Sequence, residues 1–196
     1  MATPSDDRDL TDLETDETVR VARDLIRFDT TNYGEGKAKP EKEAAEYVAA
    51  YLRELGLTPE LIDSDPGRTS VIARVTGRNP EKPALVVHGH LDVVPADPTN
   101  WSVDPFAGEI RDGMLWGRGA VDMKNMDAMI LTAAADLLRA GGAPERDLVL
   151  AFFADEENGG VYGSQHIVKT RPELFDGATE AISEVGGYSI TMGGRR

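Results

Sequence analysis

Two short, strongly apolar runs constrain the fold of this chain more than any other feature. They are ALVVHGH at residues 84–90 and DLVLAFFADEE at residues 147–157, and each passes from apolar residues directly into polar ones. Continuous apolar runs of this length are typical of strands that are covered on both faces. Three further β-rich runs occupy residues 70–77, 109–117 and 180–187. The chain is therefore expected to build a sheet whose central strands are buried between helices.

Helical periodicity appears in three segments that alternate with these runs. Apolar residues recur at helical spacing over residues 21–26, 44–55 and 126–138. Gly56 and Gly141 follow the second and third segments, where glycine commonly ends a helix. Helices that alternate with apolar strands predict an α/β fold, with a mixed, mostly parallel sheet and helices on both faces.

Composition excludes several classes of function. A formal net charge of −14 disfavours nucleic acid as a partner, because neutralising phosphates requires clustered Lys and Arg. No apolar run approaches the roughly 20 residues of a membrane-spanning helix, and the acidic N-terminus MATPSDDRDL is unlike a signal peptide. We therefore expect no membrane partner and a cytoplasmic location. The chain has no cysteine, so any metal must be bound by His, Asp or Glu.

The first apolar strand ends in a group of candidate metal ligands, HGHLD at residues 88–92. If this segment stays extended, His88, His90 and Asp92 project to the same side, because side chains alternate along a strand. A carboxylate next to a metal-binding histidine commonly accepts the second imidazole N–H and fixes the tautomer, and Asp92 is a candidate for that role. A pair of histidines at a strand end can equally be structural.

Four more acidic residues follow the same logic at three other element ends. Asp122 precedes the longest predicted helix, where an N-cap is the simpler interpretation. Glu156 and Glu157 leave the apolar run LVLAFF within three consecutive acids, which repel one another unless a cation compensates. Glu184 closes the last predicted strand, and by itself could be a solvated surface acid.

Together, these residues suit a pair of hydrolytic divalent ions. In an open α/β sheet, binding groups gather beyond the carboxyl ends of the strands. Imidazole and carboxylate ligands without sulfur favour Zn²⁺, with Co²⁺ or Mn²⁺ as alternatives, and such ions lower the pKa of water toward about 7. One acid must stay uncoordinated to accept the proton of that water. Adjacent Glu156 and Glu157 can divide the two tasks, because neighbours in an extended segment point in different directions.

The ordered motifs resemble those of a known enzyme family. GHLDVVP (89–95), GRGAVDMK (117–124), ADEENGG (154–160) and SEVGG (183–187) are similar to motifs of the co-catalytic zinc metallohydrolases. That family includes aminoacylase, carboxypeptidase G, acetylornithine deacetylase, succinyl-diaminopimelate desuccinylase and several dipeptidases. The resemblance extends from about residue 15 to the end of the chain.

The resemblance implies a role for each motif residue and a zinc-exopeptidase-like catalytic domain. The peptide bond after Asp122 is expected to be cis. His88 and His166 match no ligand position and are expected to be structural. By position, His90 and Glu184 would bind one metal, Asp122 would bridge both, Glu157 would bind the second, Glu156 would be the general base and Asp92 would support His90.

One departure concerns the completeness of the site. The family places a second histidine ligand late in the chain, beside the metal held by Glu157, and no histidine follows His166. We therefore expect residues 15–196 to be the N-terminal portion of a catalytic domain without its dimerisation domain and C-terminal portion. Such a portion would bind one metal well and have little activity. The full-length protein would be a homodimer. Residues 1–14 are charged and contain Pro, Ser, Asp and Thr, so we expect them to form a flexible tail.

The sequence thus predicts a metal-dependent hydrolase that cleaves a peptide or N-acyl amide bond of small substrates, of dipeptidase, carboxypeptidase or N-acyl-amino-acid deacylase type. One alternative is a metal-dependent aminopeptidase, which would require a free α-amine on its substrate. A second alternative is a non-catalytic metal-binding module derived from this fold. The uncoordinated acid argues against that module, since a binding protein has no use for a general base.

Overall fold

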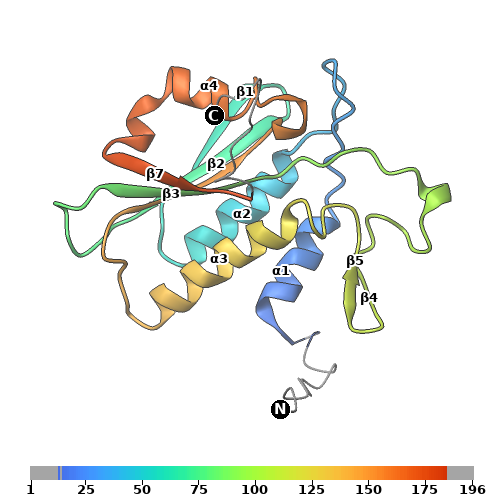
Figure 1. The fold of residues 1–196 in the computed structure, drawn as a ribbon, viewed down its shortest axis with the longest axis horizontal. Helices are drawn as coiled ribbons and strands as arrows, with labels where there is room; N and C mark the ends of the chain where they lie inside the picture. Colours follow the sequence, from blue (N-terminus) through green and yellow to red (C-terminus); the bar gives the residue numbers. More distant parts are fainter. Residues whose placement is uncertain (1–12, 14, 185–196) are drawn as a thin grey trace, which may run out of the picture.

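The computed structural model describes residue 13 and residues 15–184, so most of the predicted tail and the residues after Glu184 lie outside the described part. Within it, a five-stranded sheet has the strand order β1-β2-β6-β3-β7 (Figure 1). β3 pairs in parallel with β6 and β7, whereas β1 and β2 complete the sheet through antiparallel pairs. The strands are β1 Glu60–Asp65, β2 Arg68–Val75, β3 Ala84–His90, β6 Leu148–Phe153 and β7 Ala178–Ile182.

Of the four α-helices in the described part of the chain, α1, α2 and α3 lie on one side of this sheet and α4 lies on the other (Figure 1). The prediction of a mixed α/β sheet with helices on both faces is therefore confirmed. Gly56 and Gly141 adopt positive φ values of 81° and 69° just beyond α2 and α3, as expected for helix ends. The helices are α1 Glu17–Ile26, α2 Lys42–Glu54, α3 Lys124–Arg139 and α4 Ser164–Thr170.

Two apolar clusters explain why the central strands carry unbroken apolar runs. In β6, Leu150 and Phe152 pack into the cluster beneath α1, α2 and α3, whereas Val149 and Ala151 pack into the cluster that includes Ile167 of α4. Alternate residues of one strand thus enter opposite layers, which requires apolar side chains at every position. None of the described helices is long and apolar enough to span a bilayer.

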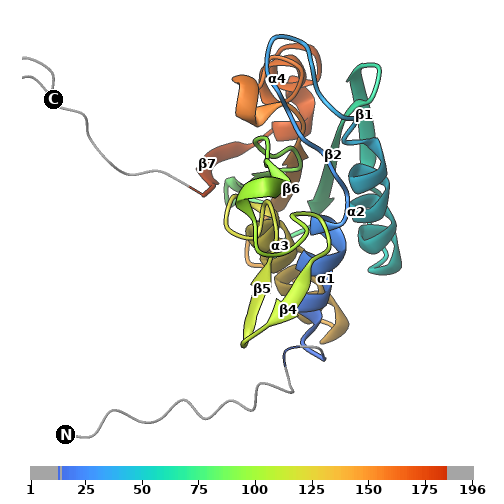
Figure 2. The same ribbon diagram turned by 90° about the vertical axis from the view of Figure 1, so that its right-hand side faces the viewer.

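Two elements differ from the sequence-based expectation. Residues 109–117 form a two-stranded hairpin of β4 Glu109–Arg111 and β5 Met114–Trp116 that lies apart from the main sheet, near α1 (Figure 2). The turn residues Asp112 and Gly113 have φ values of 55° and 71°, as a tight hairpin turn requires. β1 has no apolar run that could have predicted it, because this edge strand is largely exposed.

The parallel strands determine where the predicted ligands lie. β6, β3 and β7 are adjacent and parallel, so their carboxyl ends meet at the same edge of the sheet. His90 is the last residue of β3, and the 3₁₀ turn Glu156–Asn158 follows β6. Glu184 lies two residues beyond β7. The Asp122–Met123 peptide bond is cis, as the resemblance implies, and it precedes α3.

Candidate metal centre

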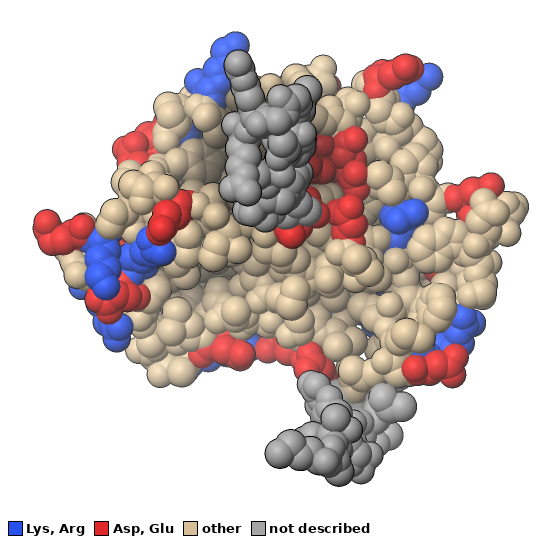
Figure 3. Space-filling view, in the orientation of Figure 1, with Lys and Arg blue, Asp and Glu red and all other residues tan. Residues whose placement is uncertain are grey.

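His90 lies at the centre of the acidic residues that the sequence singled out. Its Nε2 atom is 3.1 Å from Oδ1 of Asp122 and 3.6 Å from a carboxylate oxygen of both Glu156 and Glu184. The imidazole is only 2% exposed. Asp and Glu side chains gather near the middle of the face shown in Figure 3. The structure thus brings together residues that are up to 94 positions apart in the chain.

Two overlapping groups of donor atoms have the composition of a metal site. One consists of His90, Asp122 and Glu157, and the other of His90, Glu156 and Glu184. Within each group, one donor atom from every residue lies within 4.8 Å of the others. All five side chains offer the nitrogen or oxygen ligands that zinc and related divalent ions bind.

The electrostatics of the cluster favour a cation. The pKa of His90 rises to about 10, because burial, which lowers it, is outweighed by the nearby carboxylates of Asp92, Asp127 and Glu156. Burial is also the main reason that the pKa of Glu157 rises to about 7. Oε1 of Glu157 is buried and has no hydrogen-bond partner among the described residues. An unpartnered carboxylate oxygen beside other anionic donors fits a divalent ion.

The second nitrogen of His90 lies against Asp92. Nδ1 of His90 is 3.0 Å from the backbone carbonyl oxygen of Asp92 and 3.6 Å from its carboxylate, so the hydrogen bond goes to the main chain. The Asp92 carboxylate instead accepts the backbone N–H groups of Glu156 at 3.0 Å and Glu157 at 3.2 Å. Asp92 therefore contacts both the imidazole and the turn that carries the two glutamates.

Exposure distinguishes the two adjacent glutamates. The side chain of Glu156 is 51% exposed, whereas Glu157 is half-buried. An exposed carboxylate is the better candidate for exchanging protons with water, and the half-buried one for a ligand. Asp122 does not cap α3, because the N-cap residue is Met123 and no side chain caps this helix. The carboxylate of Asp122 is 57% exposed and faces His90.

The other two histidines lie outside the donor groups found among the described residues. His88 packs its ring edge against Phe153, with 5.5 Å between the ring centroids, and burial followed by the neighbouring His90 lowers its pKa. His166 is on α4. His88 also lines a cavity of 160 Å³ together with His90, Glu156 and Glu184. The structural roles of His88 and His166 stay predictions.

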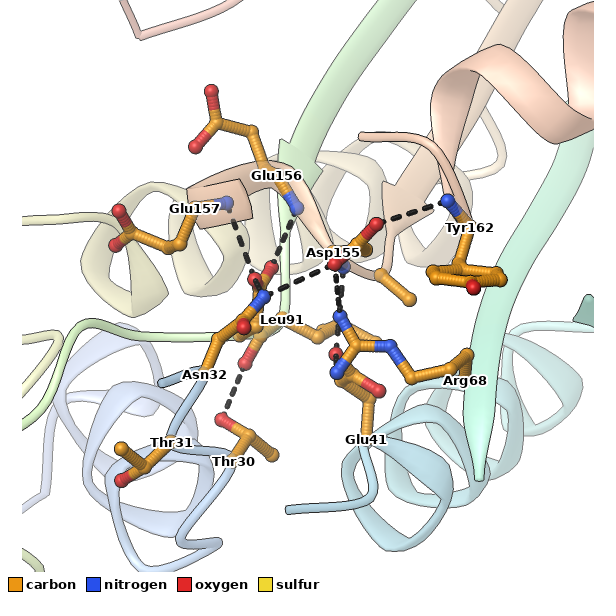
Figure 4. A network of polar contacts seen from close by, with 12 residues as sticks. Thr30, Thr31, Asn32, Glu41, Arg68, Leu91, Asp155, Glu156, Glu157 and Tyr162 are labelled. Carbon is orange, nitrogen blue, oxygen red and sulfur yellow. Dashed lines mark hydrogen bonds and ion pairs between the residues drawn. The ribbon is translucent and has the colours of Figure 1, made fainter. Parts of the chain in front are cut away.

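A buried polar network next to the site was not predicted from the sequence. It consists of Asn32, Glu41, Arg68 and Asp155 (Figure 4). Asp155 lies inside the ADEENGG motif, but the other three residues are far from every motif and occur in segments without a distinctive pattern. The signal that would have identified these three residues is the burial of their polar side chains, which becomes visible only once the fold is known.

The model of peptidase family M20/M25/M40 matches residues 86–193 of the chain. Among curated proteins, the succinyl-diaminopimelate desuccinylase of Delftia acidovorans is 40% identical over 166 residues, which cover 76% of this chain and 43% of the relative. The chain thus spans less than half the length of this relative.

Solved structures with the same fold include human carnosine dipeptidase 1, with a TM-score of 0.74 and 21% identity over 89% of this chain and 40% of that chain. A second is the M20 family metallo-carboxypeptidase Sso-CP2 from Sulfolobus solfataricus, with a TM-score of 0.72 and 25% identity. That match covers 88% of this chain and 38% of the carboxypeptidase. Both likenesses extend over nearly the whole chain.

Proposed function

Because the chain belongs to peptidase family M20/M25/M40, we propose that it carries the metal centre of a hydrolase that cleaves a peptide or N-acyl amide bond of small substrates. The convergence of one buried imidazole and three carboxylates at the ends of three parallel strands, together with the carboxylate of Asp122 just before α3, is the observation that carries this proposal. The names of its relatives, a desuccinylase and a metallo-carboxypeptidase, support the substrate class of N-acyl amino acids or small peptides.

Two divalent ions, with Zn²⁺ expected and Co²⁺ or Mn²⁺ as alternatives, would be held by the ligands named above. His90 and Glu184 would hold one ion, Glu157 would hold the other, and Asp122 would bridge the two. The ions would supply Lewis acidity, polarising the scissile carbonyl and making water more acidic. The unpartnered Oε1 of Glu157 and the short distance between Asp122 and His90 support this assignment.

Glu156 would act as the general base. Its exposed carboxylate would take a proton from the attacking water and pass it to the leaving amine nitrogen, so that no proton is gained or lost over the cycle. Asp92 would keep the imidazole of His90 and the N–H groups of Glu156 and Glu157 in fixed relative positions. This role requires a buried carboxylate, and Asp92 is fully buried.

The test compares Glu156→Gln with a matched surface substitution, Glu46→Gln on α2. The full-length protein, supplied with Zn²⁺, Co²⁺ or Mn²⁺, is assayed against dipeptides, N-acyl amino acids and peptides with a free α-amine. We expect Glu156→Gln to reduce kcat by about 10²- to 10⁴-fold while zinc binding is kept, and Glu46→Gln to have no effect.

The outcomes separate this proposal from its alternatives. Cleavage restricted to substrates with a free α-amine would indicate an aminopeptidase. Zinc binding without cleavage of any substrate would indicate a non-catalytic module. Equal activity of the Glu156→Gln variant and the wild type would remove Glu156 from the mechanism. We propose in addition that the full-length protein is a homodimer, which analytical ultracentrifugation of the same preparation would test.

A further inference from the structure

Arg68 is a buried cation held between two carboxylates. It is the first residue of β2, and its side chain is 8% exposed. One guanidinium nitrogen is 2.9 Å from Oε1 of Glu41, and the other donates to Oδ1 of Asp155 at 2.6 Å. Both partners are buried, and Figure 4 shows the guanidinium lying between them. Arg68 therefore links the start of β2 and the start of α2 to the segment that follows β6.

Asp155 is the residue immediately before the two glutamates, and it has a left-handed conformation with a φ of 63°. Only a few per cent of non-glycine residues adopt this conformation, so the surrounding contacts must hold it. Its Oδ1 also accepts the side-chain amide of Asn32 at 3.1 Å, and its Oδ2 accepts the backbone N–H of Tyr162 at 2.9 Å. Both carboxylate oxygens are thus engaged in fixing this one residue.

The network continues from Asp155 to the metal centre. The amide nitrogen of Asn32 also donates to Oδ2 of Asp92, at 2.8 Å. Asp92 in turn binds the N–H groups of Glu156 and Glu157. In Figure 4 the carboxylates of both glutamates point away from this network. That of Glu156 lies 3.6 Å from Nε2 of His90. The turn is therefore anchored through two buried aspartates that share one amide.

Stability alone gives little reason for this arrangement. Burying charges is costly because they lose their hydration, and replacing a buried ion cluster by apolar residues is often neutral or stabilising. Here a single guanidinium faces the carboxylates of Glu41 and Asp155. The side-chain amide of Asn32 joins Asp155 to a third buried carboxylate, that of Asp92. A planar guanidinium presents its N–H donors in a rigid fork, whereas the ammonium of lysine is a point charge with three rotatable donors. Directional placement of Asp155 is the property that the arginine provides.

We propose that Arg68 is a positioning residue that, through Asp155, sets the placement of the Glu156–Glu157 turn toward the metal ions. This inference rests on the proposed function, because it assumes that the turn carries a metal ligand and the general base. Arg68 itself does not reach the donor groups found among the described residues, and the two ion pairs of its side chain are to buried acids. Its effect on the metal centre is indirect.

The test measures zinc affinity of the full-length protein in competition with a chromophoric chelator, so that it does not depend on activity. Arg68→Lys keeps the charge and removes the two-pronged geometry. The matched control is Arg74→Lys, on the same strand, where Arg74 pairs with Asp147 away from the site. We expect Arg68→Lys to weaken zinc binding about 10- to 100-fold, as is typical when a residue that supports a ligand is changed, and Arg74→Lys to bind as the wild type does.

A second pair of variants separates positioning from stability. Asp155→Asn keeps the size of the side chain but weakens its link to Arg68, and it should lower zinc affinity in the same direction. Asp147→Asn is the matched control, because Asp147 pairs with Arg74 away from the site, and it should reduce stability without changing zinc affinity. Circular dichroism and urea unfolding show which variants are folded.

Each outcome decides between the two proposals. If folded Arg68→Lys binds zinc within twofold of the wild type, the positioning role is wrong and the proposed function is untouched. If both Arg68→Lys and Asp155→Asn fail to fold, the network serves stability and the positioning role is also wrong. If the wild type binds no zinc, the proposed function itself is wrong.

Discussion

The substitution Gly163→Ala should disrupt the candidate metal centre by steric overlap. Gly163 precedes α4 and has a φ of −112°, so it does not lie in the left-handed region that favours glycine. A Cβ atom at this position would lie 1.7 Å from the carbonyl oxygen of Ala154 and 2.9 Å from its carbonyl carbon. The obstacle is backbone, which no side-chain rotation can relieve.

The size of the effect follows from that distance. Real Cβ atoms essentially never approach another heavy atom closer than 3.0 Å, so the two segments would have to separate by more than about 1 Å. Ala154 is covalently joined to Asp155, and the displacement therefore passes into the Glu156–Glu157 turn. Overpacking of this kind costs about 1–3 kcal/mol of stability, and a shift of about 1 Å at a catalytic group can cost about 100-fold in rate.

Urea unfolding and zinc competition would measure both effects. The matched control is Gly141→Ala, because Gly141 has a φ of 69° but no atom within 4 Å of the added Cβ. That variant should lose about 1–2 kcal/mol through left-handed strain and keep its zinc affinity. Gly163→Ala should lose stability and zinc affinity together. Wild-type stability and zinc affinity in Gly163→Ala would refute the steric reasoning.

Two further predictions concern pH. Burial raises the pKa of Asp127 to about 8, and neither of its carboxylate oxygens has a hydrogen-bond partner among the described residues. The pKa of Asp127 is higher in the folded state than in the unfolded state, where it is near 3.8, so Asp127 contributes its full stability only below that pH. This contribution is lost as the pH rises through about 8. In urea unfolding without metal, Asp127→Asn should therefore gain stability relative to the wild type between pH 5 and 8, and parallel pH profiles would contradict this. Second, the raised pKa of His90 means that zinc must displace a proton, so zinc affinity should rise about tenfold per pH unit between pH 6 and 8. A calorimetric titration that detects no proton release would contradict this expectation.

The parts of the fold that depend on local pattern could be predicted from the sequence. Helical spacing within residues 126–138 predicted α3, and the apolar run at 84–90 predicted β3 with its correct bounds. Both signals are local, because the period of a helix or strand decides which of its own residues face the core. The placement of His90 and Glu184 at neighbouring strand ends followed from the α/β class, since parallel strands end at a common edge.

Features that depend on partners distant in the chain could not be predicted. β1 is an exposed edge strand defined by its pairing with β2, and no alternation of its own residues reveals that pairing. Arg68 looks like any surface arginine until the fold encloses it between Glu41 and Asp155. The sequence also suggested that the Asp92 carboxylate directly accepts the second N–H of His90. In the structure, Nδ1 of His90 is instead nearest to the backbone carbonyl oxygen of Asp92.

The most direct test of the central claim is anomalous X-ray scattering at the zinc absorption edge, from crystals of the full-length protein grown with Zn²⁺. We expect a strong anomalous peak between Nε2 of His90 and the carboxylates of Asp122 and Glu184, and a second peak beside Glu157. Zinc bound elsewhere on the molecule, with no peak at His90, would contradict the assignment of these strand ends as a metal centre.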